Sequence, residues 1–169
     1  MEIKKIEIRT DQFYKICDYV EKNINRENLS ENGGTLNYSD LTYDSDILLI
    51  AFDNDIPVGY NSIVKYNGGL YVYQIAVKKE YQHKGIGTEM LRKAVEIADE
   101  QETFMTANIM DYNTASQKMF SRLGFKKIGE NTATGNGFYA LHEERMNNQI
   151  KRWQYQKNNT FQTKNTNKS

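Results

Sequence analysis

Residues 70–98 read LYVYQIAVKKEYQHKGIGTEMLRKAVEIA, and this stretch decides how the chain folds. Its first part, 70–77, is rich in aromatic and β-branched residues, which is typical of a half-buried β-strand. Its last part predicts a helix, because the apolar residues recur with a period near 3.6, at Met90, Leu91, Ala94, Val95 and Ala98. A basic loop that contains two glycines, 82–88, separates the strand from the helix.

This loop stands where the predicted helix begins. The first turn of a helix has backbone N–H groups without internal partners, and the helix dipole adds partial positive charge there. Gly85 and Gly87 would let a ligand approach the backbone closely. The loop therefore predicts an anion site, most naturally for a phosphate.

Composition limits the classes of function. The chain has 169 residues, and 22 Lys and Arg balance 22 Asp and Glu, so its charge gives no reason to expect a nucleic acid or an anionic membrane as a partner. The single Cys17 excludes an intramolecular disulfide, and its place on an apolar helix face indicates a core residue rather than a nucleophile. Because no apolar run could serve as a secretory signal or cross a bilayer, we expect a cytoplasmic protein.

Stretches on either side of 70–98 predict further elements. A helix should follow a cap at Thr10 or Asp11, and another should run from a cap at Asn113 to Gly124. Further strands are expected at 2–9, 47–52, 57–66, 104–109, 125–130 and 138–142. We predict an α/β (α+β) fold with a mixed, mostly antiparallel sheet of six to seven strands flanked by helices. The helix that joins the fourth and fifth strands should make this pair parallel.

The two remaining stretches are more polar. Residues 23–46 give no clear pattern, and an acidic segment there could line a groove for a cationic substrate or be an ordinary solvated connection. Met146, Ile150 and Trp153 at helical spacing predict a helix that docks on the domain or on a second copy, which would make a homodimer. We therefore expect a domain at 1–142, a helical extension at 143–157 and a disordered tail at 158–169.

Two motifs resemble a known family. The pattern Gln82-x-x-Gly85-x-Gly87, after a strand and before a helix, resembles the Arg/Gln-x-x-Gly-x-Gly/Ala signature of the GNAT superfamily of N-acetyltransferases. Asn113, Met119-Phe120 and Leu123-Gly124-Phe125 are similar to the family's downstream Asn…Leu-Tyr…Leu-Gly-Phe segment. The resemblance implies the GNAT fold and an N-acetyltransferase domain over residues 1–142.

The resemblance also implies acetyl-CoA (coenzyme A) as the cosubstrate. The pantetheine arm would lie along the strand 70–77 as an added strand, and the pyrophosphate would accept hydrogen bonds from the amides of the loop. Asn113 would contact the cosubstrate through its side chain. The implied binding residues are Ile75, Ala76, Val77, Gln82, His83, Lys84, Gly85, Ile86, Gly87, Thr88, Asn113 and Phe120. We expect no metal.

The catalytic groups depart from the family pattern. Phe120 stands where many relatives carry a tyrosine that protonates the leaving thiolate, and Gln74 stands where they often carry an acidic base. Asp111, Tyr112 or Tyr73 could substitute, although packing in the core or in a groove wall explains both tyrosines better than catalysis does, or water could carry the protons. A third explanation of these departures is that the domain binds acetyl-CoA and catalyses the transfer poorly.

We therefore expect an acetyl-CoA-dependent N-acetyltransferase that acts on a primary amine of a small molecule or of a protein. The alternative is a non-catalytic acyl-CoA-binding or sensing module. A third class, nucleic-acid binding, rests only on the basic segment 151–157. With balanced charge overall, we expect neither nucleic acid nor a membrane as partner.

Overall fold

The computed structural model describes residues 1–25 and 42–166, with side chains up to residue 160. One sheet of seven strands forms its centre, in the order β1-β2-β3-β4-β5-β7-β6. The strands are β1 (Glu2–Ile6), β2 (Ile47–Asp53), β3 (Ile56–Tyr66), β4 (Gly69–Val77), β5 (Met105–Ile109), β6 (Lys126–Glu130) and β7 (Gly137–Leu141). Neighbouring strands are antiparallel except β4 and β5, which are parallel. The expected fold class is therefore confirmed, including the parallel fourth and fifth strands.

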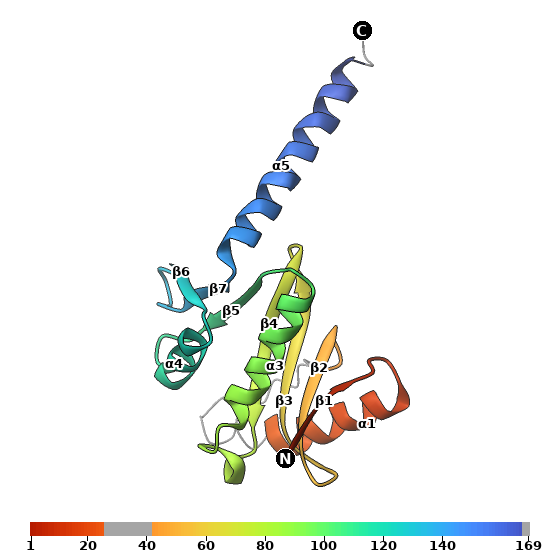
Figure 1. The fold of residues 1–169 in the computed structure, drawn as a ribbon, viewed down its shortest axis with the longest axis vertical. Helices are drawn as coiled ribbons and strands as arrows, with labels where there is room; N and C mark the ends of the chain where they lie inside the picture. The colour runs from red at the N-terminus through yellow and green to blue at the C-terminus, as the bar shows by residue number, and fades with distance from the viewer. Residues whose placement is uncertain (26–41, 167–169) are drawn as a thin grey trace.

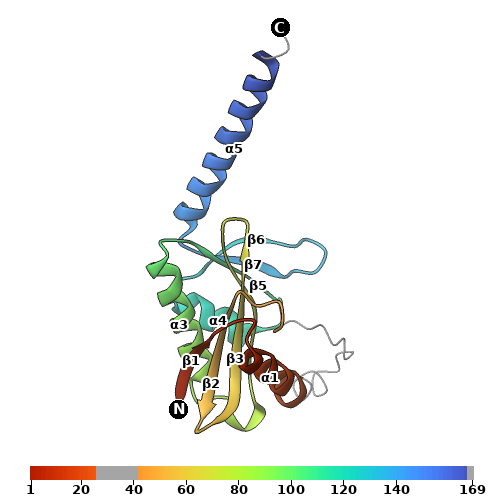
Figure 2. The ribbon, with the colours of Figure 1, turned by 90° about the vertical axis from the view of Figure 1, so that its right-hand side faces the viewer.

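Helices cover both faces of this sheet (Figure 2). Helix α1 (Asp11–Val20) lies on one face, and helices α3 (Ile86–Glu100) and α4 (Thr114–Arg122) lie on the other. The predicted caps at Thr10 and Asn113 are confirmed, because their side chains accept hydrogen bonds from the backbone N–H groups of Phe13 and Ser116, at 3.2 and 3.1 Å. A short π-helical segment, η1 (Glu21–Asn25), continues α1.

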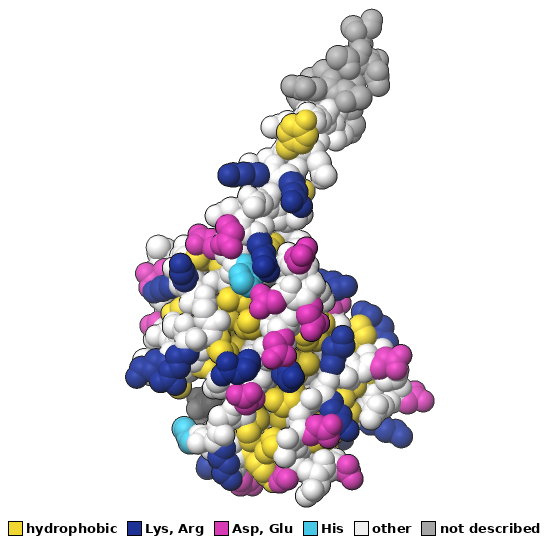
Figure 3. Space-filling model, in the orientation of Figure 1, with side chains coloured by type: hydrophobic (Ala, Val, Ile, Leu, Met, Phe, Trp, Pro, Cys, Tyr) yellow, Lys and Arg dark blue, Asp and Glu magenta, His cyan; other side chains and the backbone are white. Residues whose placement is uncertain are grey.

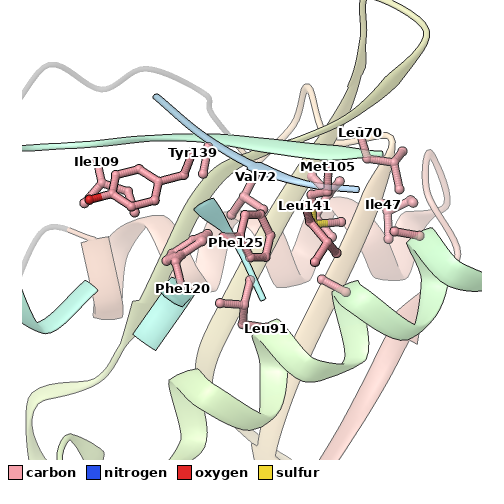
Figure 4. Close-up of a cluster of buried hydrophobic side chains, with 14 of the residues drawn as sticks. Ile47, Leu70, Val72, Leu91, Met105, Ile109, Phe120, Phe125, Tyr139 and Leu141 are labelled. Carbon is pink, nitrogen blue, oxygen red and sulfur yellow. The ribbon is translucent and has the colours of Figure 1, made fainter. Parts of the chain in front are cut away.

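The core is divided by the sheet. Beneath α3 and α4, aromatic and aliphatic side chains such as Val72, Leu91, Phe120 and Phe125 pack into one cluster (Figure 4). On the other face, the buried side of α1 packs on β2 and β3, and Cys17 is fully buried there as predicted. Residues 47–51 of β2 are buried throughout, which confirms a strand covered on both faces.

A tight hairpin sets the start of β4. Tyr66 pairs with Gly69 across a two-residue turn, Asn67-Gly68, whose φ angles are 52° and 84°. Two central residues with positive φ are the mark of a type I′ turn, whose twist matches that of the flanking strands. The predicted hairpin is confirmed, and it fixes the register of β4 on β3.

Helix α5 (Glu143–Thr166) projects away from the sheet (Figure 1), and it continues beyond residue 157. Its first turn is held by the domain, because Arg145 donates to the carbonyl oxygen of Thr103 at 3.0 Å. Apolar residues of α5 line one side of a groove of about 680 Å³ whose other side is the sheet, yet Trp153 stays 60% exposed. No helix in the ranges 1–25 and 42–166 is both long enough and apolar enough to cross a membrane.

Candidate active site

The two parallel strands diverge soon after they meet (Figure 1). Residues 70–72 of β4 pair with 105–107 of β5, and beyond this point β4 continues along β3 alone. Within the described part of the chain, residues 73–76 of β4 therefore have no strand on their second edge. Such an edge can hydrogen-bond an extended ligand as an added strand, through backbone groups alone.

A β-bulge lies where the divergence begins. Val72 is opposite Ile63 and Gln74 is opposite Ser62, so Tyr73 is an extra residue in β4. In a regular strand Gln74 would point to the same face as Val72, into the core beneath α3. The bulge instead turns Gln74 to the face that α1 covers, where its side chain contacts Asn25.

The loop 82–88 presents an open helix N-terminus to this edge. Gly85 is the N-cap of α3 with φ 83°, and no side chain caps this helix, whereas Thr10 and Asn113 cap α1 and α4. A Cβ atom on Gly85 would meet no other atom within 4 Å, so the space in front of the loop is open. The first-turn N–H groups of α3 can therefore bind an anion.

Side chains tie this loop to the sheet. Gln82 donates to the carbonyl oxygen of Val77 at 3.0 Å, which closes the loop onto the end of β4. Tyr81 donates to a carboxylate oxygen of Asp53 at 2.6 Å, and this hydrogen bond raises the pKa of Tyr81. The ammonium of Lys84 lies 5.4 Å from the centre of the Tyr81 ring, which keeps a positive charge beside the loop.

The other predicted site residues are spread more widely. Asn113 uses its side-chain oxygen to cap α4. Asp111 and Tyr112 lie in the turn between β5 and α4, where Tyr112 is 79% exposed. Of the three candidates for proton transfer, Tyr73 alone lies on β4 beside Gln74, and its ring is 6.3 Å from that of Tyr71. In the structure the loop 82–88 thus lies at the end of β4, whereas Asp111 and Tyr112 lie on the exposed turn between β5 and α4.

A buried polar network beside Gln74 was not predicted. Asn25 accepts hydrogen bonds from Gln74 Nε2 at 2.9 Å and from the Tyr60 hydroxyl at 2.6 Å, and its own Nδ2 donates to Glu21 at 2.9 Å. Thr42 donates to the second Glu21 oxygen at 2.9 Å. Sequence patterns could not reveal this network, because Asn25 and Gln74 are 49 residues apart.

Burial and the negative charge of Glu21 raise the pKa values of two neighbouring side chains, Tyr60 and Cys17. Burial, followed by the negative charge of Glu21, raises the pKa of Tyr60 well above its ordinary value, so its hydroxyl stays a hydrogen-bond donor. Burial raises the pKa of the Cys17 thiol to about 11, although a hydrogen bond with Thr42 acts in the opposite direction. Among the described residues, no three or more His, Cys, Asp or Glu side chains are grouped as a metal site requires.

Comparison with known proteins identifies the family. The profile of the Acetyltransferase (GNAT) family matches residues 8–125, which run from just after β1, through α1, to just past the end of α4. The chain belongs to the GNAT family of acetyltransferases. Both resembling motifs, at 82–87 and 113–125, lie within the matched range. No curated protein matches this sequence closely enough to count as a relative.

Solved structures share the GNAT fold at low sequence identity. A putative GNAT acetyltransferase from Desulfovibrio desulfuricans has a TM-score of 0.65 and 18% identity, over 83% of this chain and 98% of that chain. PaiA N-acetyltransferase from Thermoplasma acidophilum, in complex with coenzyme A, has a TM-score of 0.62 and 15% identity, over 83% and 99%. A putative streptothricin acetyltransferase from Bacillus anthracis, in complex with acetyl coenzyme A, has 22% identity and a TM-score of 0.52. That match covers 57% of this chain and 61% of the other.

Proposed function

We propose that this GNAT protein is an N-acetyltransferase that moves an acetyl group from acetyl-CoA to a primary amine. One observation carries the proposal: the edge of β4 that diverges from β5 is followed, after the connection 78–85, by the open N-terminus of α3. An extended chain that ends in a pyrophosphate matches these two features in that order. Neither feature depends on particular side chains, so low sequence identity to other GNAT proteins does not weaken the match.

The residues present fit acetyl-CoA. Backbone groups of Ile75, Ala76 and Val77 would hold the pantetheine arm, and the amides of 82–88 would hold the pyrophosphate. Gly85 supports this assignment, because its φ of 83° and the open space before it suit a phosphate close to the backbone. Lys84 adds positive charge beside the loop. When bound, acetyl-CoA supplies the thioester from which the acetyl group is transferred.

The chain's own groups must orient the amine, stabilise an oxyanion and handle protons. Backbone N–H groups on the diverging edge of β4 can stabilise the oxyanion. Phe120 cannot supply a proton, because its ring is buried in the core and carries no hydroxyl. We propose that Tyr73 or water moves the protons, since Tyr73 is the candidate that lies on β4 and is partly exposed. Asp111 and Tyr112 remain secondary candidates because of their place on the exposed turn.

A second function has a specific observation in its favour. Phe120 and Gln74 offer neither an acid nor a base, so the same fold could bind an acyl-CoA without transferring the acyl group. This reading keeps the cosubstrate site and removes the amine acceptor.

One experiment separates the two functions. Binding of acetyl-CoA is measured by calorimetry, and thiol release is then followed with amines that include n-butylamine, putrescine and a lysine peptide with a free N-terminus. We expect binding together with release that depends on the amine. Tight binding without release on any of these amines would favour the binding module, and absence of binding would overturn both readings. The acceptor that is acetylated distinguishes a small-molecule enzyme from a protein acetyltransferase.

A further inference from the structure

The network beside Gln74 is directional. Both carboxylate oxygens of Glu21 accept hydrogen bonds, one from Asn25 and one from Thr42, which is the pattern of an ionised carboxylate. Asn25 is 4% exposed, so its amide cannot exchange these partners for water. The orientation of the Asn25 amide therefore depends on Glu21, and the orientation of the Gln74 amide depends on Asn25.

Glu21 determines which way Asn25 faces. An ionised carboxylate has no hydrogen to donate, so Asn25 must turn its NH₂ group toward Glu21. Its carbonyl oxygen then faces the opposite side, where the hydroxyl of Tyr60 donates to it at 2.6 Å. With the reverse orientation, the Asn25 carbonyl oxygen would face the Glu21 carboxylate, which would repel it.

Asn25 in turn determines which way Gln74 faces. The Asn25 oxygen requires a donor from Gln74, and Gln74 Nε2 supplies it at 2.9 Å. The return contact, from Asn25 Nδ2 to Gln74 Oε1, is long at 3.4 Å. Gln74 Oε1 thus keeps accepting capacity, and it lies at the bulge of β4, beside the diverging edge.

We propose that Glu21 is a positioning residue for acetyl transfer to a cationic primary amine: through Asn25 it orients Gln74, whose carbonyl oxygen accepts a hydrogen bond from the amine. This inference rests on the function proposed above. Gln74 cannot act as a base, but once water or Tyr73 has taken the proton of the ammonium, it can hold the neutral amine with its lone pair toward the acetyl group. The charge of Glu21, partly shielded from water, favours an acceptor that arrives as an ammonium ion.

The kinetic test uses Glu21→Gln, which keeps the size of the side chain and removes the constraint on Asn25. We expect kcat with putrescine to fall by roughly tenfold to a hundredfold, because the amine is no longer oriented. The KM for acetyl-CoA and the calorimetric affinity for acetyl-CoA should both stay unchanged, since β4 and the loop 82–88 are intact. Glu100→Gln, at an exposed glutamate near the end of α3, is the matched control and should leave all parameters unchanged.

The directional test uses a polarity swap. In Gln74→Glu, a carboxylate oxygen replaces the Nε2 donor and faces the Asn25 carbonyl oxygen, which repels it, so both the unfolding midpoint in urea and the turnover should fall. In the double variant Glu21→Gln/Gln74→Glu, Asn25 can reverse and donate to the carboxylate at position 74 while it accepts from the amide at position 21. The Tyr60 hydroxyl then loses its acceptor, so we expect the midpoint to recover in part. Recovery in the double variant is an effect that simple loss of packing would not produce.

The outcomes separate this inference from the proposed function. If the wild-type protein binds acetyl-CoA but acetylates no amine, the proposed function fails and this inference fails with it. If the wild type is active and Glu21→Gln matches it with putrescine, the positioning role alone is overturned. Additive loss of stability in the double variant would overturn the directional network.

Discussion

The ring of Phe120 lies edge-on to the ring of Phe125, with ring centres 4.9 Å apart and planes at 78° (Figure 4). Phe120 comes from α4 and Phe125 precedes β6, and Gly124, with φ 96°, ends the helix between them. The backbone N–H of Phe125 donates to the carbonyl oxygen of Phe120 at 3.1 Å, which closes this turn. Phe120 is therefore a core residue in a position where many GNAT proteins carry a tyrosine.

Replacing this ring should destabilise the fold. Phe120→Ala removes a side chain that is 3% exposed, so we expect a loss of about 3–5 kcal/mol in the free energy of unfolding in urea. A double-mutant cycle with Phe125→Ala should show a coupling of about 0.5–1.5 kcal/mol, because an edge-on pair contributes beyond its buried area. Additive effects of the two substitutions would show that the rings do not interact.

Gly85 should be required for the cosubstrate and dispensable for the core. Gly85→Val forces a β-branched residue into φ 83°, which costs about 1–2 kcal/mol locally and distorts the loop. We expect calorimetry to show acetyl-CoA binding weakened at least about tenfold, while the far-ultraviolet circular dichroism stays that of the native protein.

A second glycine with positive φ is the control for this variant. Gly135, with φ 77°, lies in the turn between β6 and β7, away from the loop 82–88. Gly135→Val introduces similar backbone strain, and its Cβ would meet Asp111 at 3.2–3.5 Å rather than the loop 82–88, so acetyl-CoA affinity should stay unchanged. Equal loss of affinity in both variants would show that backbone strain anywhere in the domain disrupts binding. The assignment of the pyrophosphate to the loop at Gly85 would then lose its support.

Cys17 should be unreactive in the native protein. Burial raises the pKa of its thiol from the ordinary 9.0 to about 11, so the folded state binds this proton more tightly than the unfolded state. The resulting stabilisation is fully present below the pKa of the unfolded thiol and is lost as pH rises through about 11. We expect a thiol reagent to react slowly at about pH 8 and rapidly after urea is added. Rapid reaction without urea would place Cys17 outside the core.

The surface charge gives no reason to expect that a charged thiol reagent is attracted to the native protein. Acidic and basic side chains are interspersed on the face shown in Figure 3, in agreement with the equal numbers of the two charges in the sequence. Cys17→Ser is a direct comparison, because it should abolish the reaction in urea as well.

Asn61 offers a route to higher stability. Its side chain is fully buried on β3, and neither its amide nitrogen nor its oxygen has a partner in the described part of the chain. A buried amide without partners costs about 1–3 kcal/mol, and a leucine of similar size removes this cost. We expect Asn61→Leu to raise the midpoint of thermal unfolding, whereas Asn147→Leu, on the exposed side of α5, should not. A lower midpoint in Asn61→Leu would indicate that the amide is satisfied in solution.

The sequence by itself determined the features that depend on neighbouring residues. The aromatic and β-branched residues of 70–77 predicted β4, and the period near 3.6 in the last part of 70–98 predicted α3. Thr10 and Asn113 were predicted as caps because a cap acts within one helical turn. Asn67-Gly68 predicted the hairpin for the same reason. The helix N-terminus behind Gly85 could be proposed as an anion site because a loop, a glycine and the first helical turn are adjacent in the chain.

Tertiary structure alone placed the side chains that we propose for the acceptor side of the site. The extra residue Tyr73 turns Gln74 from the face beneath α3 to the face beneath α1, and this depends on the register between β3 and β4. Asn25 and Glu21 meet Gln74 only because α1 packs across the sheet, which brings together residues that are 49 positions apart. Local sequence patterns carry no information about such contacts, because the packing of distant segments determines them.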